Sequence, residues 1–273
     1  MRQITQEEMR QIQLDMLDYI DQIARDNHIE YSLGGGSLLG AMRHKGFIPW
    51  DDDIDLMLER SQYERLMEVL AEDKNPDFKL LHHSTERNLW PFAKLYHTKS
   101  YYISKTDRIH PWTGLFIDIF PIDKLPNTQE ERNKFFKKVR LAAENLKCTT
   151  FPNFASGSNH LFAFARLILG MPRFALYHGQ SKQKAVEVDE VMSTYNATNV
   201  KFRGYTDSRY RLKECFPAEI FDHYEDVNFE HLVVRKIKEE KIYLNQLYGA
   251  SYMELPPEHK RESHDYYTWY WKE

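Results

Sequence analysis

Four carboxylates stand within five positions of the sequence, at Asp51, Asp52, Asp53 and Asp55. Negative charges this close together repel one another unless a positive group lies among them. If residues 53–58 form a strand, Asp53 and Asp55 project from one face, because side chains alternate along a strand. Two carboxylates side by side suit a hard divalent cation such as Mg²⁺. The alternative is an exposed acidic turn, which the apolar alternation that follows argues against.

An EF-hand calcium loop also begins with carboxylates at the spacing of Asp51, Asp53 and Asp55. Such a loop needs glycine at its sixth position and glutamate at its twelfth. This sequence has Leu56 and Gln62 at those positions, so the carboxylates do not belong to an EF-hand.

A glycine run precedes the carboxylates. Gly35, Gly36 and Ser37 stand at the start of a predicted short helix, where backbone N–H groups and a hydroxyl can hold a phosphate oxygen. A Walker loop is excluded because Gly-Lys-Ser/Thr is absent, and Leu39 excludes a dinucleotide fingerprint. A turn that needs a positive φ explains the glycines equally well. The carboxylates that follow favour the phosphate interpretation.

A further carboxylate lies in the apolar run GLFIDIF, at Asp118. A charged group inside such a strand is unfavourable by several kcal/mol unless it is paired or bound to a metal. We therefore prefer a functional role for Asp118 over a buried salt bridge. If this strand lies beside residues 53–58, three carboxylates converge on one metal site.

The elements that position these groups follow from apolar periodicity. Residues 5–27 predict an amphipathic helix with Thr5 and Glu8 as its capping box. A strand at 29–33, a helix at 37–43 and a strand at 53–58 are predicted next. A further helix is predicted after a cap formed by Ser61 and Glu64, and three strands follow at 78–83, 92–97 and 114–120. Helices are predicted at 128–147, 159–177 and 181–195, then a hairpin around 226–235 and a helix over 236–248. This order predicts an α+β fold with a helical insertion.

Residues 159–177 are apolar on most sides, with Arg166 and Arg173 as their charged residues. Two interpretations stay open. The segment lies on the inner leaflet of a membrane, or it is a buried core helix of a small helical subdomain, which the pattern favours. Removing its apolar side chains abolishes liposome binding in the first case and unfolds the protein in the second.

Composition narrows the class of protein. The chain has 273 residues, 42% apolar and 14% aromatic, which is typical of a globular protein and excludes disorder. Two cysteines, Cys148 and Cys215, cannot form a disulfide framework or a cysteine-rich zinc site, and they fit a reducing compartment. The polar N-terminus and the lack of a long apolar run lead us to expect no signal peptide, no membrane span and a cytoplasmic location.

The net charge of −4 hides an uneven distribution. Residues 131–213 contain 15 Lys and Arg against 6 Asp and Glu, a balance of +9, and the remainder has 22 against 35, a balance of −13. This split indicates an anionic partner, although a solvated basic helix surface accounts for it equally well. The segment lacks a nucleic-acid recognition motif, so we do not expect nucleic acid as a partner.

The sequence resembles the LicD family in four blocks, GGGSLLG, RHKGFIPWDDDIDLML, GLFIDIFPID and LYGASYMELPPEHKRESH, which lie towards both ends of the chain. These proteins are phosphocholine transferases with a nucleotidyltransferase (polymerase-β-like) fold, related to fukutin and fukutin-related protein. The resemblance implies a mixed β-sheet core with flanking helices over residues 1–127. It also implies a basic helical insertion over 128–215, which faces the acceptor or a membrane, and a C-terminal segment over 216–273 that returns to the core.

The resemblance implies roles for the carboxylates and the glycines. Asp53 and Asp55 are the paired Mg²⁺ ligands, and Asp118 shares a metal and accepts the proton of the attacking hydroxyl. Asp51 and Asp52 shape the loop. The residues implied to bind the donor phosphates are Gly35, Gly36 and Ser37, joined by Arg43, His44 and Lys45, for which solvated loop charges are an equal alternative.

The implied reaction transfers phosphocholine from CDP-choline to a sugar hydroxyl of a bacterial cell-surface glycan precursor, teichoic or lipoteichoic acid, and releases CMP. One or two Mg²⁺ ions are expected and zinc is not, because two distant cysteines cannot form the zinc site attributed to fukutin-related protein. Two alternatives remain. The first is another enzyme of the same fold, either a transferase that uses CDP-ribitol or CDP-glycerol or a nucleotidyltransferase. The second is an inactive module that binds a nucleotide or a glycan. Intact Asp53, Asp55 and Asp118 argue against the inactive module.

Choline carries a diffuse positive charge, so its recognition implies aromatic faces or carboxylates. The aromatic residues near the motifs are Trp50, Trp90, Trp112, Tyr96 and Tyr101. For each one, packing in the core is the commoner role. Arg261 and His264 lie in the C-terminal block, where closure of the tail over the site is one hypothesis.

Overall fold

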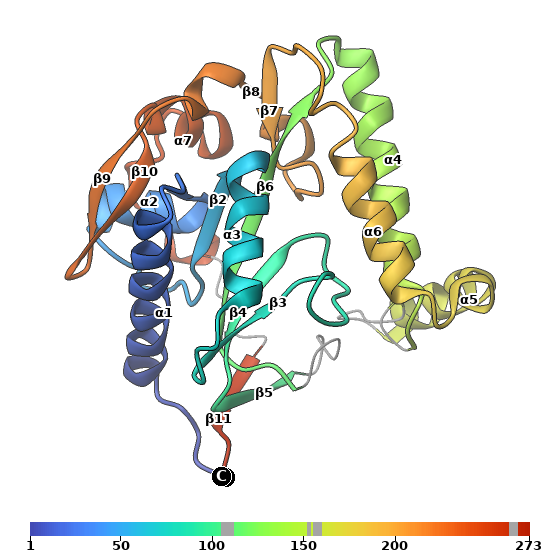
Figure 1. Ribbon diagram of the computed structural model, residues 1–273, viewed down its shortest axis with the longest axis horizontal. Coiled ribbons are helices and arrows are strands. Elements are labelled where there is room, and N and C mark those ends of the chain that lie inside the picture. The colour runs from blue at the N-terminus through green and yellow to red at the C-terminus, as the bar shows by residue number, and fades with distance from the viewer. Residues whose placement is uncertain (105–111, 152–153, 155–159, 262–266) are drawn as a thin grey trace.

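The computed structural model describes residues 1–273 except 105–111, 152–153, 155–159 and 262–266 (Figure 1). Its α-helices are α1 (Gln6–Asp26), α2 (Gly35–His44), α3 (Arg60–Glu72), α4 (Gln129–Lys147), α5 (His160–Tyr177), α6 (Ser181–Met192) and α7 (Glu240–Tyr248). Its strands are β1 (Ser32–Leu33), β2 (Asp55–Glu59), β3 (Phe78–Leu81), β4 (Ala93–His97), β5 (Ser100–Ser104), β6 (Phe116–Leu125), β7 (Phe202–Gly204), β8 (Phe216–Pro217), β9 (Tyr224–Phe229), β10 (Leu232–Ile237) and β11 (Tyr267–Trp271). This order confirms the predicted α+β fold.

The main sheet has the order β1-β2-β6-β4-β3, and β7 and β8 extend it from the far part of β6. The strands β2 and β6 are parallel, and β6 pairs with β4 and β7 in antiparallel fashion. The central strand β6 thus has partners from three separate parts of the chain. Because β7 lies within residues 128–215, the end of the predicted insertion contributes a strand to the core sheet.

The first helix forms as its sequence predicts. Thr5 accepts a hydrogen bond from the Glu8 amide, and the Glu8 side chain accepts one from the Thr5 amide. The predicted stripe is buried from Met9 to Ile20. This stripe packs α1 against β4, β6 and β10, while α3 covers β2, β3 and β6 (Figure 1). Burial of such a stripe is the main source of stability for a helix of this kind.

Several predicted boundaries are wrong. The predicted strand 53–58 begins at Asp55, and the predicted strand 29–33 is reduced to β1. The predicted capping box at Ser61 and Glu64 does not form, because α3 begins at Arg60. Tertiary contacts fix that start, since the Arg60 guanidinium lies 2.7 Å from Asp123. The hairpin β9–β10 continues to Ile237, so α7 begins only at Glu240.

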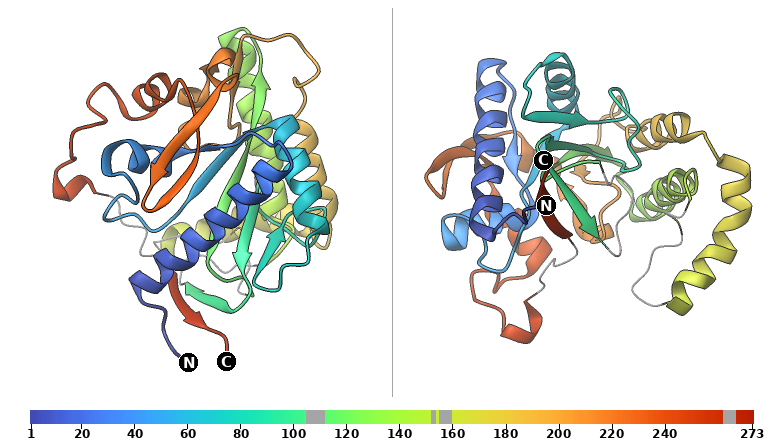
Figure 2. Two further views of the ribbon diagram at one scale, coloured as in Figure 1. Left: turned by 60° about the vertical axis from the view of Figure 1, so that its left-hand side comes forward. Right: turned by 90° about the horizontal axis from the view of Figure 1, so that it is seen from below.

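The helices α4, α5 and α6 form an arm beside the sheet, with α5 at its outer end (Figure 2). Thr128 caps α4 as predicted, and α4 packs along α6. The prediction that 159–177 is a buried core helix is wrong, because Leu161 is 80% exposed and Leu169 is 77% exposed. None of the described helices has the length and hydropathy needed to span a bilayer.

The two ends of the chain meet on one side of the sheet (Figure 2). The aromatic tail forms β11, which pairs with β5, and Gln3 forms a β-bridge with Tyr270. Sequence periodicity missed β5 and β11, because the aromatic residues of the tail do not alternate with polar ones.

Candidate active site

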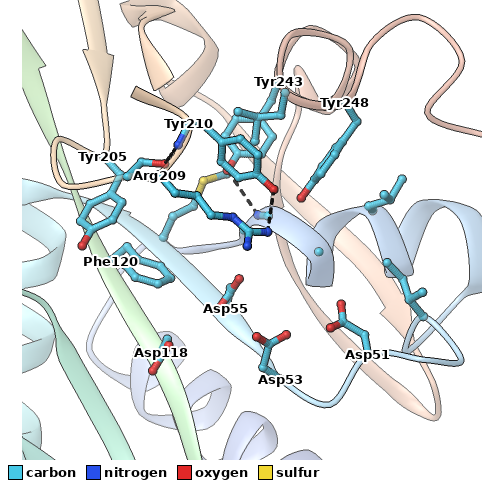
Figure 3. Close-up of a pocket in the computed structure, with 18 of the residues that line it drawn as sticks. Asp51, Asp53, Asp55, Asp118, Phe120, Tyr205, Arg209, Tyr210, Tyr243 and Tyr248 are labelled. Carbon is cyan, nitrogen blue, oxygen red and sulfur yellow. Dashed lines mark hydrogen bonds between the residues drawn. The ribbon is translucent and has the colours of Figure 1, made fainter. Parts of the chain in front are cut away.

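A cavity of about 940 Å³ opens where α2 begins and β2 begins (Figure 3). One side of it carries the carboxylates Asp51, Asp53, Asp55 and Asp118. Phe120 stands beside Asp118 on β6, and the facing wall carries the rings of Tyr205, Tyr210, Tyr243 and Tyr248. The cavity thus places negative charge opposite aromatic surface.

The parallel pairing of β2 and β6 brings Asp55 directly opposite Asp118. The Asp55 amide donates a hydrogen bond to Ser37 Oγ at 2.8 Å, which fixes the start of β2 against α2. Removal of the Asp55 carboxyl from bulk water, together with the charges of Asp53, Asp118 and Asp51, raises its pKa well above the usual range. Such a group of like charges favours a bound cation.

The glycines are required by the close approach of these carboxylates. Gly35 has a φ of +45°, and a Cβ atom there would stand 3.0 Å from Asp55 Oδ2. A Cβ atom on Gly36 would stand 2.7 Å from Asp51 Oδ2. Both glycines line the cavity, and the Gly35 amide donates to the Tyr243 hydroxyl at 3.2 Å. At Gly35 a positive φ and a close contact with the Asp55 carboxylate therefore both require glycine.

The other predicted phosphate-binding residues lie in different places. Arg43 lines the cavity, and its Nη1 donates to the carbonyl oxygens of Tyr252 at 2.8 Å and Glu254 at 3.2 Å. Ser37 is buried with its hydroxyl engaged by Asp55, and Lys45 is exposed at the end of α2. Neither Ser37 nor Lys45 is among the described residues that line the cavity.

The predicted aromatic residues divide in the same way. Trp50 and Trp90 line the cavity, and Trp112, Tyr96 and Tyr101 are not among its described lining residues. The Arg261 guanidinium lies 4.5 Å from the centroid of the Trp50 ring, near the cavity. His264 lies outside the described residues.

Sequence analysis missed Lys94, whose Nζ lies 2.5 Å from Asp118 Oδ1. Lys94 is 5% exposed, and its Nζ lies 3.5 Å from the centroid of the Phe116 ring. Asp118 thus forms the buried salt bridge that the sequence argument set aside, and it also lines the cavity. The sequence signal for this pair was a lysine within the apolar run FAKLYH, which resembles the aspartate within the apolar run GLFIDIF.

The loop from Tyr205 to Glu214 was also missed, and it forms much of the aromatic wall. Glu214 is 5% exposed, and its Oε1 accepts a hydrogen bond from Ser208 Oγ at 2.9 Å. Burial raises the pKa of Glu214 to about 7 and the pKa of Asp207 to about 6. A hydroxyl does not compensate a carboxylate charge. The same wall also carries Arg209 and Lys147, so it offers a ligand groups of both signs.

Residues 28–173 match the family described as LicD/FKTN/FKRP, nucleotidyltransferase domain, which is more than half of the chain. The chain belongs to this family. Over 270 residues it is 29% identical to the lipopolysaccharide cholinephosphotransferase LicD of Haemophilus influenzae, with 97% of both chains covered. An uncharacterised protein of Rickettsia typhi is 36% identical over 56 residues, 20% of this chain and 18% of that protein. The resemblance seen in the sequence and the nucleotidyltransferase-like fold are thereby confirmed.

The carboxylates of the cavity fit a hard cation. Carboxylate oxygens of Asp51, Asp52 and Asp53 lie within 4.8 Å of one another, and Asp55 adds its unfavourable charge beside them. Oxygen ligands of this kind are those that Mg²⁺ prefers, whereas zinc sites use cysteine and histidine.

A smaller cavity of about 210 Å³ adjoins the LicD-family site. The two cavities share Asp53, Asp118, Trp90 and Phe92 in their walls. Asp53 and Asp118 therefore face both spaces. The two cavities therefore meet at one pair of carboxylates.

Proposed function

We propose that this LicD-family chain transfers phosphocholine from CDP-choline to a sugar hydroxyl of a bacterial cell-surface glycan precursor and releases CMP. The observation that carries the proposal is the cavity that holds Asp55 and Asp118 opposite a wall of tyrosines and a buried carboxylate. The Haemophilus relative is named a lipopolysaccharide cholinephosphotransferase, which agrees with this chemistry.

The pyrophosphate of the donor lies between α2 and the opposite wall. The start of α2, at Gly35 and Gly36, is the positive end of the helix dipole, and the Gly35 amide there already donates to the Tyr243 hydroxyl. Arg209 extends from the aromatic wall towards the carboxylates and supplies a guanidinium for the phosphates (Figure 3). Mg²⁺ would be held by Asp53, Asp55 and Asp118 as the family resemblance implies, although the described carboxylates that cluster within 4.8 Å are Asp51, Asp52 and Asp53. When bound, it would supply charge neutralisation for the phosphates.

The transfer needs one proton acceptor. The oxygen of the sugar hydroxyl bonds to the phosphorus that carries choline, while the bond from that phosphorus to the CMP oxygen breaks and its electron pair leaves with CMP. Asp118 accepts the hydroxyl proton. Lys94 holds the Asp118 carboxylate through Oδ1 and so acts as a positioning residue. The acceptor enters through the smaller cavity, which Asp118 also lines.

The choline group binds at Tyr205, Tyr210 and Glu214. A trimethylammonium ion has no N–H to donate, so it is recognised by ring faces and negative charge. The Tyr205 and Phe120 ring centroids lie 4.7 Å apart, and Glu214 adds a buried carboxylate to the same wall. Ribitol or glycerol would instead need several hydrogen-bonding groups, so this wall favours CDP-choline over CDP-ribitol and CDP-glycerol.

The acceptor is an anionic glycan or a lipid-linked precursor, which the basic helical arm attracts. A teichoic or lipoteichoic acid precursor and a lipopolysaccharide sugar both offer the required hydroxyl. We place the reaction in the cytoplasm, the location expected from the sequence.

The test is CMP release from purified protein with CDP-choline and Mg²⁺, using a teichoic acid precursor and a lipopolysaccharide acceptor in separate arms. We expect metal-dependent release that Asp118→Asn abolishes and that Asp26→Asn, an exposed control on α1, leaves intact. Release with CDP-ribitol or CDP-glycerol but not CDP-choline would overturn the donor. Silence with every donor would favour a binding module.

A further inference from the structure

The helix α5 lies at the edge of the molecule (Figure 2). Its outward side carries exposed apolar side chains. Seven of its large apolar side chains are between 43% and 80% exposed, namely Leu161, Phe162, Phe164, Ile168, Leu169, Met171 and Leu176. An exposed patch of many large apolar side chains marks an interaction site on a protein in water.

A single stripe attaches α5 to the rest of the chain. Its less exposed positions recur every three or four residues, at Ala163, Leu167, Gly170, Phe174 and Tyr177. A Cβ atom on Gly170 would lie 2.3 Å from Phe154, so glycine lets the helix approach closely there. The Phe154 and Phe174 ring centroids are 5.6 Å apart. This contact fixes which side of α5 faces outward.

The charge on α5 itself has one sign, because its charged residues are Arg166 and Arg173. The lysines on the neighbouring helices are paired with carboxylates, Lys147 with Glu144 at 3.9 Å and Lys184 with Glu187 at 2.6 Å. Arg166 and Arg173 are exposed and stand seven residues apart, so they lie on the same flank of the apolar side. An apolar helix side flanked by cations is typical of helices that lie in the plane of an anionic membrane.

We propose that α5 docks on an anionic phospholipid bilayer. Its apolar side chains enter the boundary between head groups and acyl chains, and Arg166 and Arg173 contact lipid phosphates. A second copy of the chain is a poorer occupant, because pairing through α5 would oppose two segments that both carry positive charge. The proposal does not depend on the transferase reaction.

The test is flotation of the full chain with vesicles of phosphatidylcholine and phosphatidylglycerol in equal parts, and with phosphatidylcholine alone. We expect the protein to float with the anionic vesicles and to be released by high salt. The triple change Phe162→Ser, Ile168→Ser and Leu169→Ser should lower partitioning about tenfold or more. The matched control is Val233→Ser with Ile242→Ser, because these apolar residues are exposed on other elements.

Arg166→Gln with Arg173→Gln should weaken the preference for phosphatidylglycerol and retain weak binding to both vesicles. Thermal denaturation of each variant shows whether it is folded. The proposal is overturned if the wild type stays unbound, or if the folded triple variant floats like the wild type. It is also overturned if light scattering shows a dimer that the triple variant dissociates while neither binds vesicles. None of these results bears on CMP release without vesicles.

Discussion

Asp55 on β2 and Asp118 on β6 are register partners in a parallel pair of strands. Their carboxylates therefore lie on the same face of the sheet, and Asp51 and Asp53 approach from the preceding loop (Figure 3). Burial of the Asp55 carboxyl, together with repulsion from the neighbouring carboxylates, raises its pKa and lowers stability unless a cation is present. Activity and stability therefore place opposite demands on this part of the chain.

Asp55→Asn should raise the melting temperature in the presence of a chelator, because it removes one of the repelling charges. The same change should reduce the stabilisation that Mg²⁺ gives the wild type and lower CMP release by about 10³-fold. Thermal denaturation with and without Mg²⁺ measures the first two effects, with Asp26→Asn as the exposed control. A variant that melts below the wild type in chelator and keeps the full Mg²⁺ response would contradict this account.

Lys94→Met should lower the free energy of unfolding by about 3 kcal/mol, because it leaves the Asp118 carboxylate without its buried cation. The loss should be smaller in an Asp118→Asn background, where no charge remains to be compensated. Urea denaturation of the two single variants and the double variant measures this coupling. Equal losses in both backgrounds would mean that Lys94 stabilises the fold through its aromatic neighbours rather than through Asp118.

Glu214 should make binding of the choline donor depend on pH. Burial raises its pKa to about 7, so the carboxyl is largely neutral below that pH and gains its negative charge above it. The KM for CDP-choline should therefore fall between about pH 6 and about pH 8.

The variant Glu214→Gln should raise KM about tenfold at about pH 8 and remove its pH dependence, while kcat changes little. Steady-state CMP release across this range measures both constants. Glu219→Gln is the matched control, because it makes the same exchange at an exposed position that is not among the described lining residues of the cavity. An unchanged KM in the glutamine variant, with CDP-choline still turned over, would refute this choline site and leave the reaction intact.

Sequence reasoning reached the carboxylates because Asp53, Asp55 and Asp118 stand beside strand-like apolar runs. It missed Glu214 because a loop has no periodicity, and only the pairing of β7 with β6 brings that loop over the cavity. It predicted a buried α5 because hydropathy measures how favourable burial would be and does not show whether a partner is available. The sequence did not predict that β2 lies beside β6, because strand order depends on pairing between distant parts of the chain.

His82 should make the protein less stable in mild acid. It is 8% exposed, its ring centroid lies 4.0 Å from that of His83, and burial lowers its pKa from 6.5 to about 3. Between these two values the unfolded chain binds a proton that the folded chain does not, so stability falls as pH decreases below about 6.5. At about pH 5 His82 by itself lowers the free energy of unfolding by about 2 kcal/mol relative to neutral pH. The raised pKa values of Glu214 and Asp207 act in the opposite direction, because these carboxyls bind protons more readily in the folded chain. The His82 contribution is therefore measured as the difference between the wild type and His82→Gln in urea denaturation at the two pH values. The exposed His231→Gln variant is the control, and the same change with pH in His82→Gln as in the wild type would contradict this role of His82.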